Sequence, residues 1–285
     1  MKKLIFILFI FSALYFNAQV KNTSNGSGNM IQNMVTTLKH DTCLNKKFSL
    51  VFYIVLDSNY SVGNATPANL NTMVANLNAA FKPICVQFLN CSTVFIPQYP
   101  YDNWTKNIVD PIVTTNYYTD KTINVYITNT VTGGSYENEY AYPPPASNTV
   151  SAKDVIVLTK GSLVSSNSVP FQSHIPIHQF GHFFGLPHTF EEISSLGSPS
   201  LEFFNRTNCY TRGDGFCDTE ADPFPIGNVV GPICGYSSGP QDANSEYYVP
   251  PVDNLMSLYP CRCHFTQEQY NYMAYVILTK RLYLH

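Results

Sequence analysis

The sequence feature that most constrains this chain is a set of three histidines between residues 178 and 188. His178 and His182 are four residues apart, so on a helix they project from the same face, one turn apart. Gly185 can adopt a positive φ and end that helix, after which the chain can turn back towards His188. A single histidine on an apolar face is usually a core residue, but a third histidine at this spacing makes coincidence a poor explanation. Three neutral imidazoles that converge in this way predict a zinc site with a fourth position open for water.

The residue after the first histidine decides what such a site can do. In hydrolytic sites built on this kind of helix it is a glutamate that takes a proton from the metal-bound water. This chain has Gln179 there. An amide of nearly the same size can hydrogen-bond the water but cannot accept a proton. The sequence therefore predicts that zinc binding is retained, while general-base catalysis, worth about 10²–10⁴-fold, is lost.

The pattern H-x-x-x-H-x-x-G-x-x-H resembles that of the metzincin clan of zinc metallopeptidases, and the continuation Leu186–Phe190 resembles the pappalysin family within it. Sharper matches in the second half of the chain are Gly213–Thr219 (the family's GDGVxDTP), Asn254–Ser257 (its Met-turn) and Phe265–Gln269 (the start of its last helix). Softer matches are Leu77–Phe81 and Tyr140–Pro143. The likeness spans about residues 46–282 and implies that Met256 lies beneath the metal.

The resemblance implies a metzincin-like catalytic domain of the α/β (α+β) class over residues 46–285. Its N-terminal subdomain, 46–188, would hold a mixed twisted sheet and two long helices. Its C-terminal subdomain, 189–285, would be loop-rich, stapled by disulfides, and end in a helix. A protein or peptide would bind in the cleft between them, with the metal on the floor of that cleft.

Two further departures concern the site. Leu258 stands two residues after Met256, where the family usually has a tyrosine facing the zinc, and Tyr259 comes one residue late. Loss of such a donor costs roughly 10²–10³ in rate. Pro176 precedes His178 by two residues, and because proline is tolerated only in the first turn, the helix starts near His178 or is kinked there.

Two hypotheses about function follow. One is a relative that keeps zinc and the cleft, has little or no peptidase activity, and binds peptides or another protein. The other is an active zinc endopeptidase that cleaves extracellular proteins with an unusual base.

The N-terminus predicts export. Residues 1–18 contain Lys2 and Lys3, an apolar run from Leu4 to Phe16, and a small residue at the end, as in a secretory signal of bacterial type. The run is short for a membrane span, although an uncleaved anchor is the alternative. Residues 19–45 are rich in Asn, Ser, Gly and Thr, which predicts a poorly ordered lead-in or the remnant of a pro-segment.

The low and negative charge of the chain argues against nucleic acid as a partner. Only 12% of residues are charged, and removal of the two leader lysines changes the formal net charge from −3 to −5. Without a basic patch we expect no nucleic-acid binding. We expect a secreted, extracellular monomer with no membrane span.

The eight cysteines of an exported chain favour disulfides. Three precede the histidine motif and five follow it: Cys43, Cys85 and Cys91, then Cys209, Cys217, Cys234, Cys261 and Cys263. If all eight pair within the chain, at least one bridge joins the two halves. A second zinc site at Cys261-x-Cys263 lacks a matching pair of ligands at a usual spacing.

An acidic loop offers a candidate calcium site. Asp214 and Asp218, with Glu220 and Asp222 nearby, crowd a short segment that contains glycines. Carboxylate oxygens grouped in this way could hold Ca²⁺. The alternative is a solvated acidic loop held by the bridge of Cys217.

Local patterns also predict secondary structure, and two further histidines are expected to lie outside the metal site. We expect strands at 49–56, 86–89, 123–127 and 155–158, one helix opened by Thr66 and Pro67, and a last helix with a capping box from Thr266 to Gln269. His174 is expected to be exposed or to cap the metal-binding helix, and His264 to be superficial.

Overall fold

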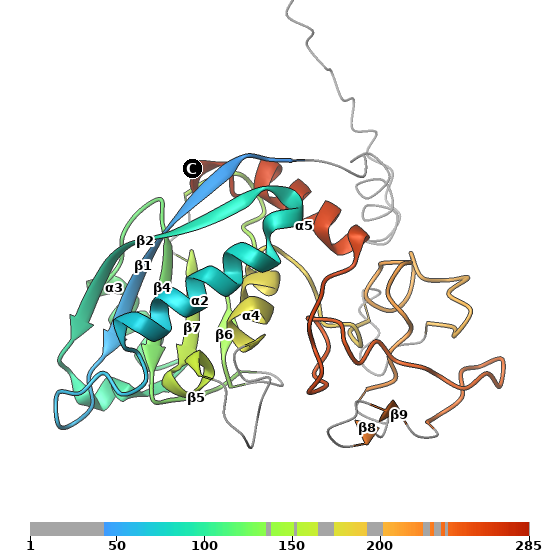
Figure 1. Ribbon diagram of the computed structural model, residues 1–285, viewed down its shortest axis with the longest axis horizontal. Coiled ribbons are helices and arrows are strands. Elements are labelled where there is room, and N and C mark those ends of the chain that lie inside the picture. Colours follow the sequence, from blue (N-terminus) through green and yellow to red (C-terminus); the bar gives the residue numbers. More distant parts are fainter. Residues whose placement is uncertain are drawn as a thin grey trace, which may run out of the picture.

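The computed structural model describes residues 43–134, 138–150, 153–164, 174–192, 202–224, 229–230, 235–236 and 239–284. The expected signal peptide, residues 19–42 of the lead-in, and Cys234 lie outside these ranges. Figure 1 shows a layered α/β part that is built from the first half of the chain, with a loop-rich part beside it. The last helix returns from the loops to the layered part.

A five-stranded sheet in the order β2-β1-β4-β7-β6 forms the centre of the layered part. The strands are β1 (Lys46–Val55), β2 (Val86–Ile96), β4 (Ile123–Thr128), β6 (Tyr140–Ala141) and β7 (Val155–Thr159). All neighbouring pairs are parallel except β6 with β7, which is antiparallel. Every residue of β4 is buried, which explains the continuous apolar runs that marked the strands. The four predicted strands are confirmed, and β2 runs further than expected because its outer residues are exposed and break the apolar pattern.

Helices cover both faces of the sheet. On one face lie α2 (Pro67–Ala80) and the shorter α4 (Ile175–Phe183), and on the other lies α3 (Val109–Asn116) (Figure 1). The cap predicted at Thr66 is confirmed, because its hydroxyl accepts a hydrogen bond from the amide of Asn69 at 3.3 Å. Short elements complete the described residues: 3₁₀ turns at Lys82–Ile84, Tyr99–Asp102, Lys160–Leu163 and Leu282–Leu284, and strands β3 (Asn103–Thr105), β5 (Thr130–Thr132), β8 (Val229–Val230) and β9 (Gly235–Tyr236).

An aromatic core joins the sheet to the helices above it. Phe88 of β2 packs edge-on against Phe180 of α4 and against Phe81 at the end of α2, with ring centroids 5.0 and 5.2 Å apart. Phe265, from the second half of the chain, packs on Phe81 at 5.8 Å. Rings of this kind bury large apolar areas and prefer such tilted contacts. The helix α4 therefore packs in a core to which both halves of the chain contribute.

The last helix, α5 (Gln267–Thr279), belongs by packing to the first half of the chain. Its predicted capping box is confirmed: the Thr266 hydroxyl accepts from the amide of Gln269, and the Gln269 side chain accepts from the amide of Thr266. Met273 and Ile277 are fully buried in the same core as β1 and α2. α5 thus forms one border of the space in front of α4.

The disulfide pattern differs from the expected one. Cys43 is bonded to Cys85 and Cys209 to Cys217, so each of these bridges lies within one half. The premise that all eight cysteines pair is wrong, because Cys91 and Cys263 are free thiols in exposed positions. The pair Cys261-x-Cys263 is no zinc site, since Cys261 is itself disulfide-bonded.

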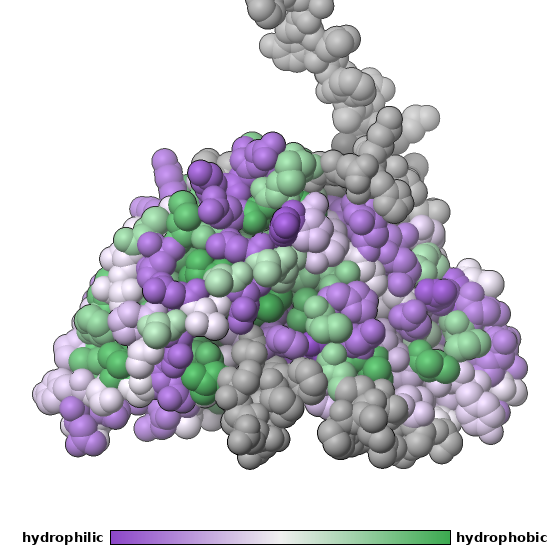
Figure 2. All heavy atoms as spheres, viewed as in Figure 1, coloured by the Kyte–Doolittle hydropathy of each residue, from purple (hydrophilic) through white to green (hydrophobic). Residues whose placement is uncertain are grey.

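The surface of the described residues is mixed in character. Figure 2 shows hydrophilic and hydrophobic side chains interspersed over one face of the molecule. No helix among the described residues has the length and hydropathy needed to cross a membrane.

Candidate metal centre

The helix that carries the first two histidines begins at Ile175, so Pro176 falls in its first turn and causes no kink. It ends as the glycine predicts. Gly185 has φ +94° and donates from its amide to the carbonyl of His182 at 2.9 Å, while the amide of Leu186 donates to Gly181 at 3.0 Å. These are the two hydrogen bonds of a Schellman turn. The turn reverses the chain and returns His188 to the face of the helix.

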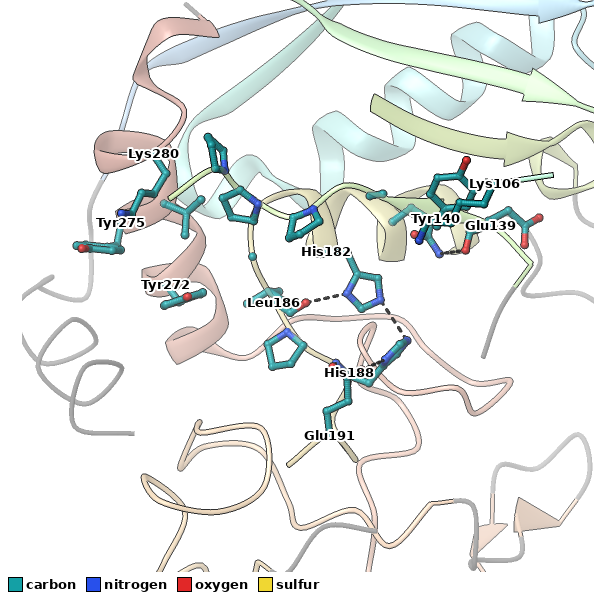
Figure 3. Close-up of a pocket in the computed structure, with 18 residues that line it drawn as sticks. Lys106, Glu139, Tyr140, His182, Leu186, His188, Glu191, Tyr272, Tyr275 and Lys280 are labelled. Atoms are coloured by element: carbon teal, nitrogen blue, oxygen red, sulfur yellow. Dashed lines mark hydrogen bonds and ion pairs between the residues drawn. The ribbon is translucent and has the colours of Figure 1, made fainter. Parts of the chain in front are cut away.

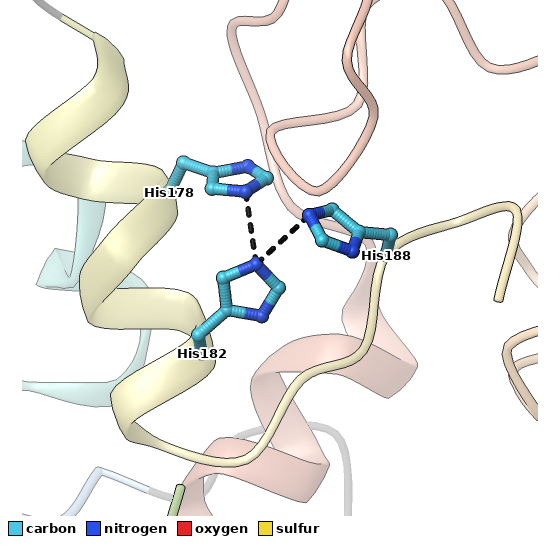
Figure 4. Close-up of side chains that lie close together, drawn as sticks. All are labelled: His178, His182 and His188. Atoms are coloured by element: carbon cyan, nitrogen blue, oxygen red, sulfur yellow. Dashed lines mark hydrogen bonds between the residues drawn. The ribbon is translucent and has the colours of Figure 1, made fainter. Parts of the chain in front are cut away.

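The three imidazoles meet at their Nε2 atoms (Figure 4). His182 Nε2 lies 2.9 Å from His178 Nε2 and 3.1 Å from His188 Nε2. Tetrahedral zinc with bonds of 2.0–2.1 Å separates its nitrogen ligands by about 3.3 Å. The side chains are therefore arranged for one divalent ion, as the sequence predicted.

The Nδ1 atom of each imidazole, which lies on the opposite side of the ring from the metal position, contacts an oxygen atom that orients the ring. His178 donates to the carbonyl of Leu255 at 2.6 Å and His182 to the carbonyl of Leu186 at 2.7 Å. Nδ1 of His188 lies 3.1 Å from Oε1 of Glu191. Carbonyl and carboxylate oxygens only accept here, so Nδ1 carries the proton and the Nε2 lone pair is left for the metal.

Burial keeps the two histidines of α4 neutral. His178 is fully buried, and burial, with the adjacent imidazoles, holds its pKa well below the ordinary value. Burial and the neighbouring His188 lower the pKa of His182 to about 3. Neutral imidazole is the form that binds zinc.

Met256 packs against the helix that carries His178 and His182. It is fully buried, and a Cβ added to Gly181 of α4 would come within 2.5 Å of its Sδ. Its carbonyl accepts from the amide of Thr189 at 3.2 Å. The methionine thus packs against α4 between the two helical ligands and is tied to the segment that follows the third.

The side chain at the general-base position is buried next to the metal ligands. Nε2 of Gln179 donates to the carbonyl of Glu139 at 3.3 Å. The phenol of Tyr259 donates to Oδ1 of Asp222 at 2.6 Å, so it points elsewhere, as its late position predicted. Leu258 is partly exposed.

A cavity of about 640 Å³ opens in front of the histidines (Figure 3). Its borders are the segment around β6, including Tyr140 and Pro143–Pro145, and the side of α5. Gln179, His182 and His188 face it from α4 and the turn. Lys106 lies with its Nζ 4.4 Å from the centroid of the Tyr140 ring.

The candidate calcium residues lie in the loop-rich part. Asp214 is buried rather than solvated, whereas Oδ2 of Asp218 accepts from the amide of Glu268 at 2.8 Å and so caps α5. The structure adds Glu202, which the sequence could not indicate: it is 1% exposed and lies against Gly213. Burial, followed by repulsion from Asp214, raises the pKa of Glu202 to about 10.

The two remaining histidines lie outside the metal centre. His174 occupies the cap position of α4 and is partly buried. The side chain of His264 is half exposed, which confirms the superficial position predicted for it.

Comparison with known proteins identifies the family. Residues 107–278 match the model of the Peptidase M43 family, described as pregnancy-associated plasma protein-A. The chain belongs to this family. An extracellular metalloprotease of Colletotrichum graminicola is 28% identical to this M43 chain over 235 residues, which are 78% of the chain and 73% of that protein.

Solved structures show the fold of the M43 chain. A promirolysin mutant of Tannerella forsythia is similar with a TM-score of 0.55 at 14% identity, over 90% of this chain and 89% of that one. Mature mirolysin of the same organism, in complex with a cleaved peptide, is similar with a TM-score of 0.50 at 14% identity, over 80% and 89%. The metzincin-like fold predicted from the sequence is confirmed.

Proposed function

We propose that this M43 chain is a secreted protein that binds one zinc ion through His178, His182 and His188 and has lost most or all peptide-bond hydrolysis. The observation that carries the proposal is Gln179. It follows the first ligand, its side chain is 2% exposed, and its amide nitrogen is bound to the carbonyl of Glu139. An amide cannot take the proton that hydrolysis removes from water.

No carboxylate among the described residues that line the cavity is placed to substitute for it. These acids are Glu139 and Glu191. Oε1 of Glu139 accepts from the hydroxyl of Thr159 at 2.5 Å. Glu191 contacts Nδ1 of His188, on the side of the ring opposite to the metal-facing Nε2. Each acid is thus committed to a contact that directs it away from a metal-bound water.

Zinc bound here would polarise a carbonyl group and acidify its own water. The residues of the chain supply the ligands, their orientation and a partly enclosed cavity. The missing base removes about 10²–10⁴ in rate. The missing tyrosine at Leu258 removes roughly another 10²–10³. What remains is a zinc site that binds far better than it hydrolyses.

The cavity is proposed to hold a protein or peptide segment. Mature mirolysin, which has the same fold, was solved with a cleaved peptide. Secretion is supported by the N-terminal pattern, by the disulfides, and by a relative that is named an extracellular metalloprotease. We propose that the chain acts as a monomer.

We also propose a Ca²⁺ ion at Asp214. This carboxylate and Glu202 are each 1% exposed, and burial raises the pKa of both. A cation would relieve the repulsion between these two buried acids, and oxygen ligands of this type suit calcium. Asp218 is a weaker candidate than the sequence indicated, because one of its oxygens caps α5.

The test compares the unmodified chain with Gln179→Glu, each analysed for bound zinc and for cleavage of an unstructured protein substrate. His182→Ala serves as the zinc-deficient control, and Gln87→Glu, at an exposed position of β2, controls for added charge. We expect equal zinc content and a chelator-sensitive gain of cleavage in Gln179→Glu alone. Substantial chelator-sensitive cleavage by the unmodified chain would instead establish the alternative, an active extracellular endopeptidase with an unusual base.

A further inference from the structure

A second group of metal-binding side chains lies outside the three-histidine centre. Asp253, Cys263 and His264 are exposed, and their ligand atoms all lie within 4.8 Å of one another. Nδ1 of His264 is 3.8 Å from Sγ of Cys263 and 3.8 Å from Oδ2 of Asp253. A thiolate, an imidazole and a carboxylate are the three side-chain types that zinc uses.

The separations are close to those of a tetrahedral ion. Bonds of about 2.3 Å to sulfur and 2.0–2.1 Å to nitrogen place these two atoms about 3.6 Å apart, and nitrogen and oxygen about 3.3 Å apart. The observed separations exceed these by a few tenths of an ångström. Small rotations of exposed side chains are enough to close the difference.

The backbone already holds the three positions together. The amides of Cys263 and His264 both donate to the carbonyl of Asp253, at 2.7 and 3.2 Å. The amide of Leu255 donates to the carbonyl of His264 at 2.7 Å, next to a β-bridge between Asn254 and His264. Metal binding therefore has to order only three side chains, which keeps its entropic cost low.

We propose that Asp253, Cys263 and His264 form a second divalent-metal site, selective for zinc-like ions, with water as the fourth ligand. The thiolate excludes hard ions such as Ca²⁺ and Mg²⁺, which take oxygen ligands. The site gives a role to Cys263, which is a free thiol in an exposed position. This proposal does not depend on whether the chain hydrolyses peptides.

The position of the site indicates what the metal would do. It joins the two ends of the loop 253–264, which contains Met256 and Leu255. The carbonyl of Leu255 accepts from His178, so this loop positions one ligand of the first centre. An ion that binds only the folded loop stabilises it by RT ln(1 + c/Kd), where c is the concentration of the free ion. A metal at the second site would thus stabilise the loop that positions a ligand of the first centre.

The first test uses thiol reactivity in the full chain, with Cys91 as an internal control. The protein is alkylated with and without added Zn²⁺, and the modification of each cysteine is followed by peptide mass spectrometry. A metal-bound thiolate is a poor nucleophile, so we expect Zn²⁺ to slow alkylation of Cys263 by on the order of tenfold or more, with Cys91 unchanged. Equal rates for Cys263 with and without Zn²⁺ would overturn the proposal.

The second test uses Co²⁺ as the probe. Only the proposed site contains a thiolate, so its occupation should produce a thiolate-to-cobalt charge-transfer band. The band should persist in His182→Ala and in Cys91→Ser, disappear in Cys263→Ser, and weaken in His264→Ala. A band that survives Cys263→Ser, or that is lost in Cys91→Ser, would refute the assignment. Because the alkylation test uses the unmodified chain, it stands even where a variant fails to fold.

Discussion

The phenol of Tyr259 donates a 2.6 Å hydrogen bond to Oδ1 of Asp222, and Oδ2 of the same carboxylate accepts from the hydroxyl of Thr189 at 2.5 Å. Thr189 directly follows the third metal ligand, and Tyr259 follows the turn that contains Met256. Asp222 is fully buried. The Asp222 carboxylate therefore joins two segments that flank the metal position. The Tyr259 phenol is used in this structural contact.

Tyr259→Phe should reduce stability and leave chemistry unchanged. Loss of a hydrogen bond to a buried carboxylate costs about 1.5–3 kcal/mol in the free energy of unfolding, measured by chemical denaturation. In a Gln179→Glu background, the same change should not alter kcat for any recovered cleavage. Tyr247→Phe, at an exposed tyrosine, is the control and should change neither quantity. A fall in kcat of about 10²-fold or more would assign Tyr259 to the reaction after all.

Glu191→Ala should weaken zinc binding. The carboxylate accepts from the amide of His188 at 3.0 Å and lies 3.1 Å from Nδ1 of the same residue, so it orients this ligand. Removal of such a partner costs about 10–100-fold in metal affinity. Competition with a chromogenic chelator measures the Kd, and Glu220→Ala, at an exposed acid, is the matched control. An unchanged Kd in Glu191→Ala would show that His188 is oriented by packing alone.

Gly181→Ala should destabilise the protein although alanine favours helix. The added methyl group would lie 2.5 Å from Sδ of Met256, and overpacking of this kind costs about 1–3 kcal/mol. Truncation of the methionine removes the clash. The double variant Gly181→Ala, Met256→Ala should therefore lose less stability than the sum of the two single variants. Additive losses in the unfolding free energy would mean that the side chains at these two positions do not clash.

The features that could be predicted from the sequence are those encoded by neighbouring residues. The three ligands lie within one short segment, and helix spacing with Gly185 is enough to bring them together. The caps at Thr66 and Thr266 and the buried strands are equally local. The helix α3 was missed because its few apolar residues form a weak pattern.

The features that escaped prediction arise from contacts between distant segments. The carbonyl of Leu255 orients His178 across 77 positions of the chain, and Glu202 lies against Gly213 from a segment without a motif. Cysteine pairing is of the same kind. A count of eight is compatible with full pairing, but Cys91 lies in an exposed part of β2 and is free. Such contacts depend on tertiary packing between segments that are distant in the sequence.

Arg281→Met should be among the most damaging single changes. Arg281 and Asp154 form a fully buried ion pair, and the guanidinium also donates to the carbonyls of Phe183 at 2.9 Å and Tyr142 at 3.0 Å. It thereby ties the end of α4 to the sheet. Loss of one partner of a buried pair costs about 3–5 kcal/mol, measured by denaturation. Lys121→Met, at an exposed cation, should have almost no effect, and a similarly small loss in Arg281→Met would contradict the role given to the pair.

Calcium should stabilise the protein more strongly as the pH rises. Burial, with the neighbouring Asp214, raises the pKa of Glu202 from 4.5 to about 10. Between these two values the folded state holds a proton that the unfolded state has released, so the stability of the calcium-free protein falls with increasing pH. Calcium binds the ionised pair and removes this penalty, whereas protons compete with it at low pH.

The measurement is the Tm of zinc-saturated protein with and without added Ca²⁺ over a series of pH values. We expect the difference in Tm to grow across the window between the two pKa values. Mg²⁺, which prefers octahedral sites that retain several waters, should give little of it. In Glu202→Gln, which removes one of the two acids, both the calcium effect and this contribution to the pH slope should largely disappear. A calcium shift of the same size in Glu202→Gln and in the unmodified chain would move the ion away from Glu202 and Asp214, because a site that does not use the pair would not respond to its loss.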